Sequence, residues 1–559
     1  MEYFRTAMEG RPQKFVKHRI EKYHSNVFKT SIVGEPMAML CGTAGNKFLF
    51  TNSNKLVTTW WPSSVSKLLG PCISTIGGDE AMQMRKMISY FFSPDAFVKL
   101  YVKTMDMATQ KHIKTHWQGK EEVKVHPNVR LYTFELACRL FMSIEDQNEI
   151  EKLATLFDIF VRGVISMPIN FPGTNFYRAK KATIAIKKEL QMLVRQRRFA
   201  LEQKTAAPSQ DLLSHLLSSP DENGKFMSES VIVNNIVLLL FAGYDTSSAA
   251  LTILMKYLAE LPEIYEKVLK EQMEIASSKD EGEFLNWDDI QKMRYSWNVA
   301  CEAIRLYPPV MGGFREAKAD LKFEGYDIPK GWKFYWNAPL THTDPSFFPD
   351  DQKFDPSRFE GAGPAPYSYV PFGGGPRMCL GKEFARLEIL IFLHNIVKKF
   401  RWNLLIPDEK IEYKMTPTPE KGLPVSLHPG KETVAPVNDQ LGARVVQHQK
   451  EVKEPTRRLR MRAISILVLC HTTHLSSYLA NGVPGMILLS LDNSFPPKGP
   501  SIVGLHFCRT GSCTVVHGND NGYTKKGSVG ILQEFHRSYG KLPLGYLSML
   551  SLKCYAKSK

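Results

Sequence analysis

Cys379 lies in a short stretch, PFGGGPRMCLG (residues 371–381), whose glycines and prolines are typical of a tightly turned loop. A phosphate-binding P-loop has four residues between its outer glycines, whereas five separate Gly375 from Gly381, and the following lysine precedes a glutamate instead of a Ser or Thr. A structural zinc site needs several Cys or His ligands at short spacing, and Cys379 has none nearby. A lone thiolate suits a cofactor that brings its remaining ligands with it.

Haem is a cofactor of this kind, because four porphyrin nitrogens hold the iron and one axial thiolate can come from the protein. The opposite axial position then stays open for oxygen. The glycines of the loop would let the backbone turn tightly beneath a macrocycle, and their amides could point at the sulfur. Arg377, two residues before the cysteine, would pair with a haem propionate.

The same stretch resembles the haem-binding signature of the cytochrome P-450 family, Phe-x-x-Gly-x-Arg-x-Cys-x-Gly, at every fixed position. The matching residues are Phe372, Gly375, Arg377, Cys379 and Gly381. The resemblance implies that Cys379 is the axial ligand of the haem iron and that Phe372 packs on the thiolate side. A plain core aromatic is the alternative for Phe372.

AGYDTS (residues 242–247) resembles the oxygen-activation motif of the family's long central helix. The resemblance implies a catalytic role for Asp245 and Thr246. Burying this pair inside an apolar helix is costly, and beside iron-bound dioxygen a hydroxyl and a carboxylate can organise a proton relay. Taken alone, the motif fits a satisfied polar pair at a helix bend equally well.

EAIR (residues 302–305) and PSRF (residues 356–359) resemble the segments that form the family's salt-bridged triad. Glu302 and Arg305 are one helical turn apart, a spacing that by itself is usually a surface ion pair of little energetic worth. Joined by Arg358, they would form a buried network that holds the segment leading to Cys379. The predicted role of this triad is therefore structural.

Two further arginines resemble the family's haem-propionate partners. Arg315 lies in GGFREA, and its alternative is an ordinary surface arginine. Arg85 lies in GDEAMQMRKM, where the family often has a tryptophan four residues earlier; here that position is Ala81. We expect both arginines to contribute to haem binding.

The resemblance is strongest to the plant branch that oxidises cyclic terpenoids, the subfamily that contains beta-amyrin 28-monooxygenase. The stretches that carry it are residues 51–70, 312–317, 329–336 and 382–400. It implies hydroxylation of a pentacyclic triterpene such as beta-amyrin, with oxidation at C-28 and continuation to aldehyde and acid as options. Aliphatic and aromatic residues at 238–242 and 310–314 are consistent with an apolar substrate.

The resemblance also implies partners, a mechanism and a location. A haem-thiolate monooxygenase binds haem b, cleaves dioxygen with help from the electron-rich thiolate, and receives electrons from NADPH through a flavoprotein reductase docked on the cysteine side. Such enzymes sit on the cytosolic face of the endoplasmic reticulum membrane. Two other hypotheses stay open: an oxygen-independent haem-thiolate isomerase or dehydratase, which would not need the pair Asp245 and Thr246, and a non-catalytic product of a damaged gene.

Composition narrows the class of protein. The chain has 559 residues, 43% of them hydrophobic, which supports a large buried core. Nine scattered cysteines do not form the paired framework of a small secreted protein, so a reducing compartment is expected. From residue 431 onward 17 Lys and Arg oppose 7 Asp and Glu, so +10 of the net charge of +16 belongs to the tail. We expect no nucleic-acid partner.

The elements that must position these residues are mostly helices. Apolar periodicity predicts helices over residues 79–92, 94–117, 149–165, 175–203, 228–261, 263–277, 287–306 and 382–400, with short strands over 48–51 and 322–328. Pro308 and Pro309 stop the helix that carries the Glu-x-x-Arg motif. The predicted fold is mainly α with small β-sheets, the cytochrome P-450 fold.

The predicted domain organisation is a catalytic domain over residues 1–430 and an unmatched basic tail over 431–559, either disordered or the product of read-through. The catalytic domain lacks the usual N-terminal membrane anchor, and the apolar loop 167–176 is a candidate for peripheral membrane contact. In the tail, His506, Cys508, Cys513 and His517 have a spacing that could bind zinc, although scattered residues are the favoured explanation. The basic run 457–462 fits a disordered segment better than a binding patch.

Overall fold

The computed structural model describes residues 2–32, 34–164 and 166–430, and within the tail four strands, Met486–Leu489, Ile502–Phe507, Cys513–Asn519 and Gly522–Lys525. The chain divides into two compact units, Met1–Asp439 and Gln440–Lys559. The predicted boundary near residue 430, and the nature of the tail beyond it, stay predictions.

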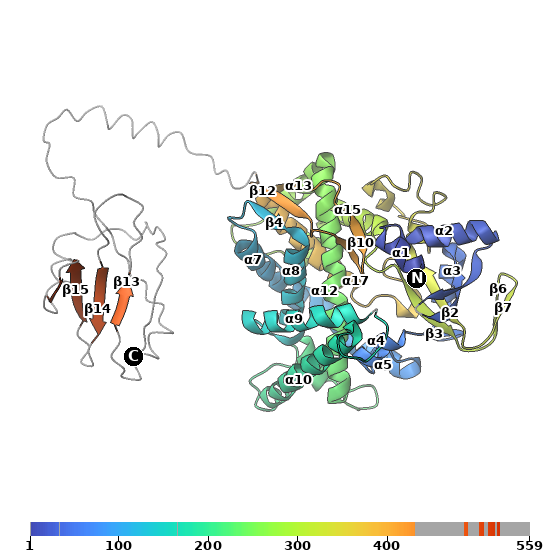
Figure 1. Ribbon diagram of the computed structural model, residues 1–559, viewed down its shortest axis with the longest axis horizontal. Coiled ribbons are helices and arrows are strands. Elements are labelled where there is room, and N and C mark those ends of the chain that lie inside the picture. Colours follow the sequence, from blue (N-terminus) through green and yellow to red (C-terminus); the bar gives the residue numbers. More distant parts are fainter. Residues whose placement is uncertain are drawn as a thin grey trace. The chain divides into compact units, whose positions relative to one another are not determined.

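Helices predominate in the first unit (Figure 1). The α-helices are α1 (Glu2–Met8), α2 (Pro12–Tyr23), α3 (Gly42–Thr51), α4 (Ser63–Leu69), α5 (Gly78–Ser89), α6 (Pro94–Ala96), α7 (Val102–His116), α8 (Val125–Met142), α9 (Gln147–Val164), α10 (Asn175–Glu202), α11 (Leu212–Ser218), α12 (Glu229–Glu260), α13 (Pro262–Ser277), α14 (Trp287–Lys292), α15 (Arg294–Leu306), α16 (Ala338–His342) and α17 (Lys382–Lys399). A π-helical segment, Phe97–Tyr101, joins α6 to α7, and short 3₁₀ turns cover Tyr90–Phe92, Pro356–Phe359 and Gly375–Arg377.

Small sheets complete this unit. The largest has the order β1 (Val27–Ile32), β2 (Glu35–Leu40), β8 (Lys333–Asn337), β5 (Gly312–Ala317) and β3 (Val57–Thr59), antiparallel except for the β2–β8 pair. A second sheet has the order β4 (Glu122–Lys124), β12 (Pro424–Pro429), β9 (Phe400–Leu404), and two hairpins pair β6 (Leu321–Phe323) with β7 (Tyr326–Ile328) and β10 (Ile411–Tyr413) with β11 (Pro417–Pro419).

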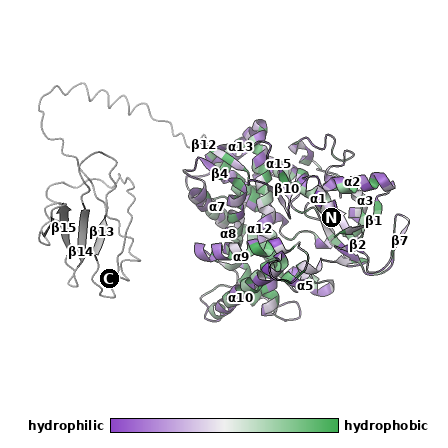
Figure 2. Cartoon of the chain, in the orientation of Figure 1, coloured by the Kyte–Doolittle hydropathy of each residue, from purple (hydrophilic) through white to green (hydrophobic). Residues whose placement is uncertain are grey.

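α12 forms the centre of the helical part (Figure 1) and packs against α8, α10 and α15. It is apolar on nearly all sides, as a helix surrounded by others must be. Outer helices such as α10 and α13 carry hydrophilic and hydrophobic residues side by side (Figure 2), because only one stripe of each faces the core. Among the described residues, α12 alone is long and apolar enough to cross a membrane. However, 72% of its most apolar 18-residue stretch is buried inside the protein, as in a core helix.

The predicted fold class, mainly helical with small sheets, is confirmed. The strand predicted over residues 48–51 is wrong, because these residues end α3, where the amide of Asn52 donates to the carbonyl of Phe48 at 3.2 Å. A short apolar run such as Phe48–Phe50 fits either a strand or a buried helix turn, and tertiary packing selects the helix. The strand predicted over 322–328 is a hairpin, turned at Glu324 and Gly325 with positive φ.

Two other differences concern helices that hold the site. The helix predicted over residues 287–306 is interrupted at Met293, so that α14, started by a capping box at Asn286, and α15 are separate. α8 is an 18-residue helix that the periodicity did not predict. Apolar side chains surround α8, so it has no single hydrophobic stripe to reveal it.

In the second unit the described strands form an antiparallel sheet in the order β13 (Met486–Leu489), β14 (Ile502–Phe507), β15 (Cys513–Asn519), β16 (Gly522–Lys525). His506 lies on β14, while Cys513 and His517 lie on β15. Cys508, the remaining residue of the hypothetical zinc set, and the basic run 457–462 lie outside the described residues.

Candidate active site

The loop that carries Cys379 is packed against α3. Gly373 and Gly375 have φ of +67° and +65°, a backbone conformation that favours glycine. A Cβ on Gly375 would lie 2.1 Å from the carbonyl oxygen of Phe50, so glycine is required there for close approach as well. The amide of Cys379 donates to the carbonyl of Phe372 at 2.9 Å, which closes the turn.

The thiol of Cys379 is both exposed and surrounded by protein. Its side chain is exposed, so the sulfur borders space that protein atoms do not fill. The pKa of the thiol is raised because surrounding protein atoms disfavour the thiolate, while the backbone amide of Gly381 and the charges of Arg85 and Lys382 lower it. The two observations agree if Cys379 faces a hollow inside the molecule.

The middle of α12 also faces open space. Most residues between 232 and 258 are buried, but Ala242 is exposed and Phe241, Gly243 and Thr246 are half-exposed. A Cβ on Gly243 would meet nothing within 4 Å. Because α12 is enclosed by other helices, this exposed face marks an internal hollow next to the predicted oxygen-activation motif.

Three arginines lie at the Cys379 loop: Arg377 belongs to the loop, and Arg85 and Arg315 come from distant segments. Arg85 of α5 donates to the carbonyl of Met378. Arg377 donates to Asn54 Oδ1 at 3.3 Å and to the carbonyls of Ile73 and Ile76. Each of these acceptors is neutral, so the contacts orient the guanidinium groups without neutralising them.

Arg315 of β5 is the most buried of the three, with an exposed fraction of 7%. Its Nη1 donates to the carbonyl of Phe314 at 2.8 Å, and its Nε has no hydrogen-bond partner among the described residues. Burial lowers the pKa of Arg315 to about 10, and the positive charge of Arg377 adds to the effect. Burial followed by repulsion from Arg85 also lowers the pKa of Arg377.

These observations fit the haem that the sequence resemblance implies. No carboxylate forms an ion pair with Arg85, Arg315 or Arg377 within the described part of the chain. Burying unpaired charges is costly, and two propionates would supply the missing anions. The exposed sulfur of Cys379 and the open face of α12 leave the space that a macrocycle requires.

The predicted catalytic pair of α12 is brought together with a residue that sequence reasoning missed. Asp245 accepts from Arg130 of α8 at 3.1 Å and from Thr416 Oγ1 at 3.1 Å. Thr246 Oγ1 donates to the carbonyl of Ala242 at 2.7 Å and lies at the half-exposed face. The carboxylate is thus held in a buried ion pair, whereas the hydroxyl next to it faces the hollow.

Arg130 links Asp245 to the surface. Its Nη2 lies 3.0 Å from Asp158 Oδ1, and Asp158 also accepts from the hydroxyl of Tyr244 at 2.7 Å. Burial alone would lower the pKa of Arg130, but the charges of Asp245 and Asp158 raise it. The sequence signal that could have identified Arg130 is a charged residue between the apolar neighbours Val129 and Leu131, because such a residue needs a carboxylate partner when buried.

The structure also brings the three members of the predicted triad together. Arg305 and Glu302 are fully buried and form a bidentate pair, with both nitrogen–oxygen distances at 2.7 Å. Arg358 Nε lies 3.4 Å from Glu302 Oε1, within ion-pair distance but not aligned for a hydrogen bond. Glu302 Oε1 also accepts from the amide of Asp355 at 3.0 Å. The roles proposed for these residues stay predictions.

His342 connects this network to the Cys379 loop, which sequence reasoning did not anticipate. Arg305 Nη1 donates to the carbonyl of His342 at 2.7 Å, and His342 Nε2 accepts from the amide of Val370 at 2.9 Å, one residue before the loop begins. Burial lowers the pKa of His342 to about 3, so the ring is neutral at physiological pH. His342 thus connects the buried ion pair to the segment that leads into the loop.

Comparisons with known proteins identify the family of this chain. Residues 2–430 match the Cytochrome P450 family. A Medicago truncatula protein named beta-amyrin 28-monooxygenase is 55% identical over 433 residues, which cover 77% of this chain and 90% of the relative. A tomato (Solanum lycopersicum) relative named beta-amyrin 6-beta-monooxygenase is 52% identical over 76% of this chain and 89% of its own length. The structure of retinoic acid-bound cyanobacterial CYP120A1 matches with a TM-score of 0.68 and 34% identity, over 74% of this chain and 94% of that one. The chain belongs to the cytochrome P450 family and is a haem-dependent monooxygenase.

Proposed function

We propose that this monooxygenase hydroxylates a pentacyclic triterpene, and that oxidation of beta-amyrin at C-28 is its reaction. The observation that carries the substrate class is 55% identity over 433 residues, which cover 90% of a beta-amyrin 28-monooxygenase. The relative named for 6-beta oxidation is almost as similar. Overall identity therefore does not distinguish the carbon attacked, and oxidation at C-28 is the finer part of the proposal.

The residues beside the hollow suit an apolar substrate. Phe241 and Ala242 of α12 offer apolar atoms to open space, and Val310, just before β5, is 41% exposed. A triterpene scaffold is almost wholly hydrocarbon, so its affinity comes from apolar area removed from water. These positions are the first to substitute when the carbon attacked is to be changed.

For the haem, we assign Cys379 as the axial ligand and Arg85, Arg315 and Arg377 as the propionate partners. Phe372, Gly375 and Gly381 shape the loop. When bound, the haem supplies the activation of dioxygen and the hydroxylation of an unactivated carbon. The protein contributes the thiolate, neutralises the propionates, and encloses the reacting carbon in an apolar space.

Thr246 and Asp245 are assigned to proton handling at the open side of α12. Thr246 Oγ1 faces the hollow, and the neighbouring Asp245 carboxylate is held by Arg130 and Thr416. Arg130 keeps its proton at neutral pH, so it orients Asp245 and does not act as a donor itself. The exposed Asp158 on the other side of Arg130 gives this pair a polar connection to solvent.

Family membership implies a redox partner, and we propose an NADPH-dependent flavoprotein reductase that docks beside the Cys379 loop. A pocket of about 310 Å³ lies there, lined in part by Trp297, Phe372, Met378 and Lys382. Electrons delivered on this side would have a short path to the thiolate. The family implies a redox partner in general, and its identity as this reductase is our proposal.

We further propose that the loop 167–176 contacts a membrane surface, on the cytosolic face of the endoplasmic reticulum. Met167, Ile169 and Phe171 are 69%, 53% and 67% exposed, a concentration of apolar side chains that water disfavours. Binding to neutral phospholipid vesicles should fall when Met167 and Phe171 are both replaced by serine. Replacing the isolated exposed Phe226 by serine should leave vesicle binding unchanged.

Two measurements test the proposed activity. The reduced, CO-bound protein should show the red-shifted Soret band of a thiolate ligand, lost in Cys379→Ala and kept in Cys301→Ala. With a reductase, NADPH and beta-amyrin, the product should gain one oxygen atom from isotopically labelled dioxygen. A band that survives Cys379→Ala contradicts the axial ligand, and an isomerised product without labelled oxygen contradicts the monooxygenase reaction.

A further inference from the structure

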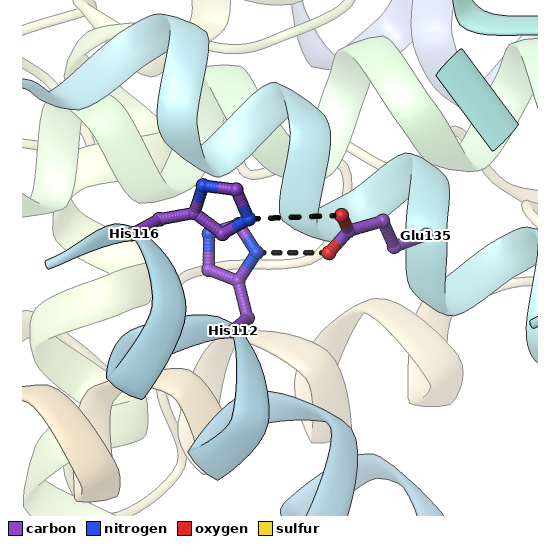
Figure 3. A group of neighbouring side chains, drawn as sticks. All are labelled: His112, His116 and Glu135. Carbon is purple, nitrogen blue, oxygen red and sulfur yellow. Dashed lines mark hydrogen bonds and ion pairs between the residues drawn. The ribbon is translucent and has the colours of Figure 1, made fainter. Parts of the chain in front are cut away.

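A second set of ligand-type side chains lies away from the Cys379 loop, between α7 and α8. His112 and His116 are four residues apart on α7, so both rings project from one face of the helix toward Glu135 of α8 (Figure 3). The candidate ligand atoms all lie within 4.8 Å of one another. Such convergence of two imidazoles and a carboxylate was not visible in the sequence, because Glu135 belongs to another helix.

The distances in this cluster are those of a site for a small cation. His112 Nδ1 lies 2.9 Å from Glu135 Oε2, and His116 Nε2 lies 3.9 Å from Glu135 Oε1. Ligand atoms about 2.0 Å from a tetrahedral zinc ion are roughly 3.3 Å apart. The two observed separations lie on either side of that value, so small rotations of Glu135 and His116 would bring all three ligands to one ion.

Not every polar atom of His112, His116 and Glu135 has a hydrogen-bond partner among the described residues. The 3.9 Å separation is too long for a hydrogen bond between His116 and Glu135. The Nε2 atom of His112, whose side chain is 1% exposed, has no partner among the described residues. The two rings are tilted by 30° to each other with centroids 4.6 Å apart, close enough for a positive charge on His112 to disfavour one on His116.

Metal binding requires neutral imidazoles and an ionised carboxylate. Burial, together with the charge of His112, lowers the pKa of His116. Burial would raise the pKa of Glu135, but hydrogen bonds and charges from His112, Gln147 and His116 lower it overall. Gln147 Nε2 donates to Glu135 Oε1 at 3.1 Å and would orient the carboxylate from outside.

We propose that His112, His116 and Glu135 form a zinc-binding site that joins α7 to α8. Two imidazoles and one carboxylate are a ligand set that suits zinc among the abundant divalent cations. The side chains of His116 and Glu135 are 27% and 20% exposed, which leaves an entry path and a fourth position for water. The ligands come from two helices, so the ion stabilises their packing.

The location connects this site to the active site through α8. Arg130, which holds Asp245, lies about one and a half turns before Glu135 on the same helix. A zinc ion that fixes α8 against α7 would steady this arginine, without contact to the hollow. Zinc binding itself, however, requires no activity and can be measured without substrate.

The experiment uses the haem-loaded full chain, freed of metal by chelator dialysis and without an affinity tag. Zinc alone is the probe, measured by equilibrium dialysis with elemental analysis and by thermal unfolding at rising zinc concentration. We expect one tightly bound zinc per chain and a Tm that rises with zinc, because an ion bound only by the folded state stabilises it. His116→Gln and Glu135→Gln should each weaken this binding at least tenfold and remove the Tm shift.

Two controls separate this site from other sources of zinc binding. His18→Gln changes an exposed histidine of α2 and should leave binding unchanged. The double variant Cys508→Ser and Cys513→Ser should also keep the tight zinc, because the tail is not part of this site. The proposal is overturned by the absence of tight zinc in the unsubstituted chain, by equal affinity in His116→Gln and Glu135→Gln, or by loss of zinc only in the tail variant. The Soret band reports that each variant is folded.

Discussion

Arg305 and Arg315 are both buried, but they differ in what neutralises their positive charge. Arg305 is fully buried against Glu302, with every strong contact supplied by the protein. Arg315 is almost as buried, but its contacts are a single carbonyl and no carboxylate. The charge of Arg305 is neutralised within the chain and stabilises the fold. The charge of Arg315 has no anion in the chain, which indicates a ligand that carries one.

The largest effect on stability is expected when the ion pair between Arg305 and Glu302 is broken. Glu302→Gln leaves the guanidinium of Arg305 buried without a counter-charge, and such losses cost about 3–5 kcal/mol. We expect a large drop in the free energy of unfolding and failure to retain haem, measured by denaturant titration and by the Soret band. Glu222→Gln removes an exposed ion pair with Lys86 and should change stability little. Equal losses of stability in Glu302→Gln and Glu222→Gln would show that the buried pair with Arg305 is worth no more than an exposed one.

Arg315→Met should change stability with opposite sign in the presence and absence of haem. Without haem, removing a buried unpaired charge should stabilise the protein, by about 1–2 kcal/mol. With haem, losing a charge-assisted contact of about 1.5–3 kcal/mol should speed haem transfer to apomyoglobin by about tenfold or more. Arg305→Met is the matched control and should destabilise both forms. A loss of stability in the haem-free form of Arg315→Met would contradict our interpretation of Arg315.

Acid should lower the free energy of unfolding through His342, which contacts the Arg305–Glu302 pair. Its pKa is about 3 in the folded state and about 6.5 when unfolded, so between these values only the unfolded chain binds the proton. Stability is therefore unaffected by this group above pH 6.5 and falls below it, by about 1.4 kcal/mol per pH unit. His126 and His394 also have pKa values lowered to about 3 by burial, and add to the slope.

His342→Asn isolates this contribution. Denaturant unfolding between pH 7 and pH 5 should show a shallower loss of stability in His342→Asn than in the unsubstituted chain. His428→Asn replaces an exposed histidine and should keep the original slope. Identical slopes for all three proteins would mean that His342 takes up its proton as readily in the folded state as in the unfolded state, contrary to a lowered pKa.

The smallest effect is expected from Arg358. Its Nε is within ion-pair distance of Glu302 but poorly aligned, and its Nη2 donates to the carbonyl of Asp350 at 3.1 Å. Arg358→Ala should lower the free energy of unfolding by about 1 kcal/mol, measured by denaturant titration. A loss as large as that of Glu302→Gln would show that the three charges act as one unit, and would sharpen the contrast with Arg315.

The predictable part of the site lies where function requires several residues close together in the sequence. Cys379, Arg377 and their glycines share one turn, so their spacing carries the geometry of the loop. Glu302 and Arg305 are likewise one helical turn apart. For α3 the same local reasoning failed, because the run around Phe48 has no periodicity that distinguishes a strand from a buried helix turn.

Helical periodicity predicted a mainly helical chain, and the resemblance of its motifs to the cytochrome P450 family gave the family and Cys379 as the proposed haem ligand. Only the tertiary structure decided that Arg130 holds Asp245, that His342 joins the buried ion pair to the loop, and that His112 and His116 meet Glu135. These contacts link residues 19 to 115 positions apart. The physical reason is that a buried charge is satisfied by whichever partner the packing of helices brings near, and that partner leaves no local pattern in the sequence.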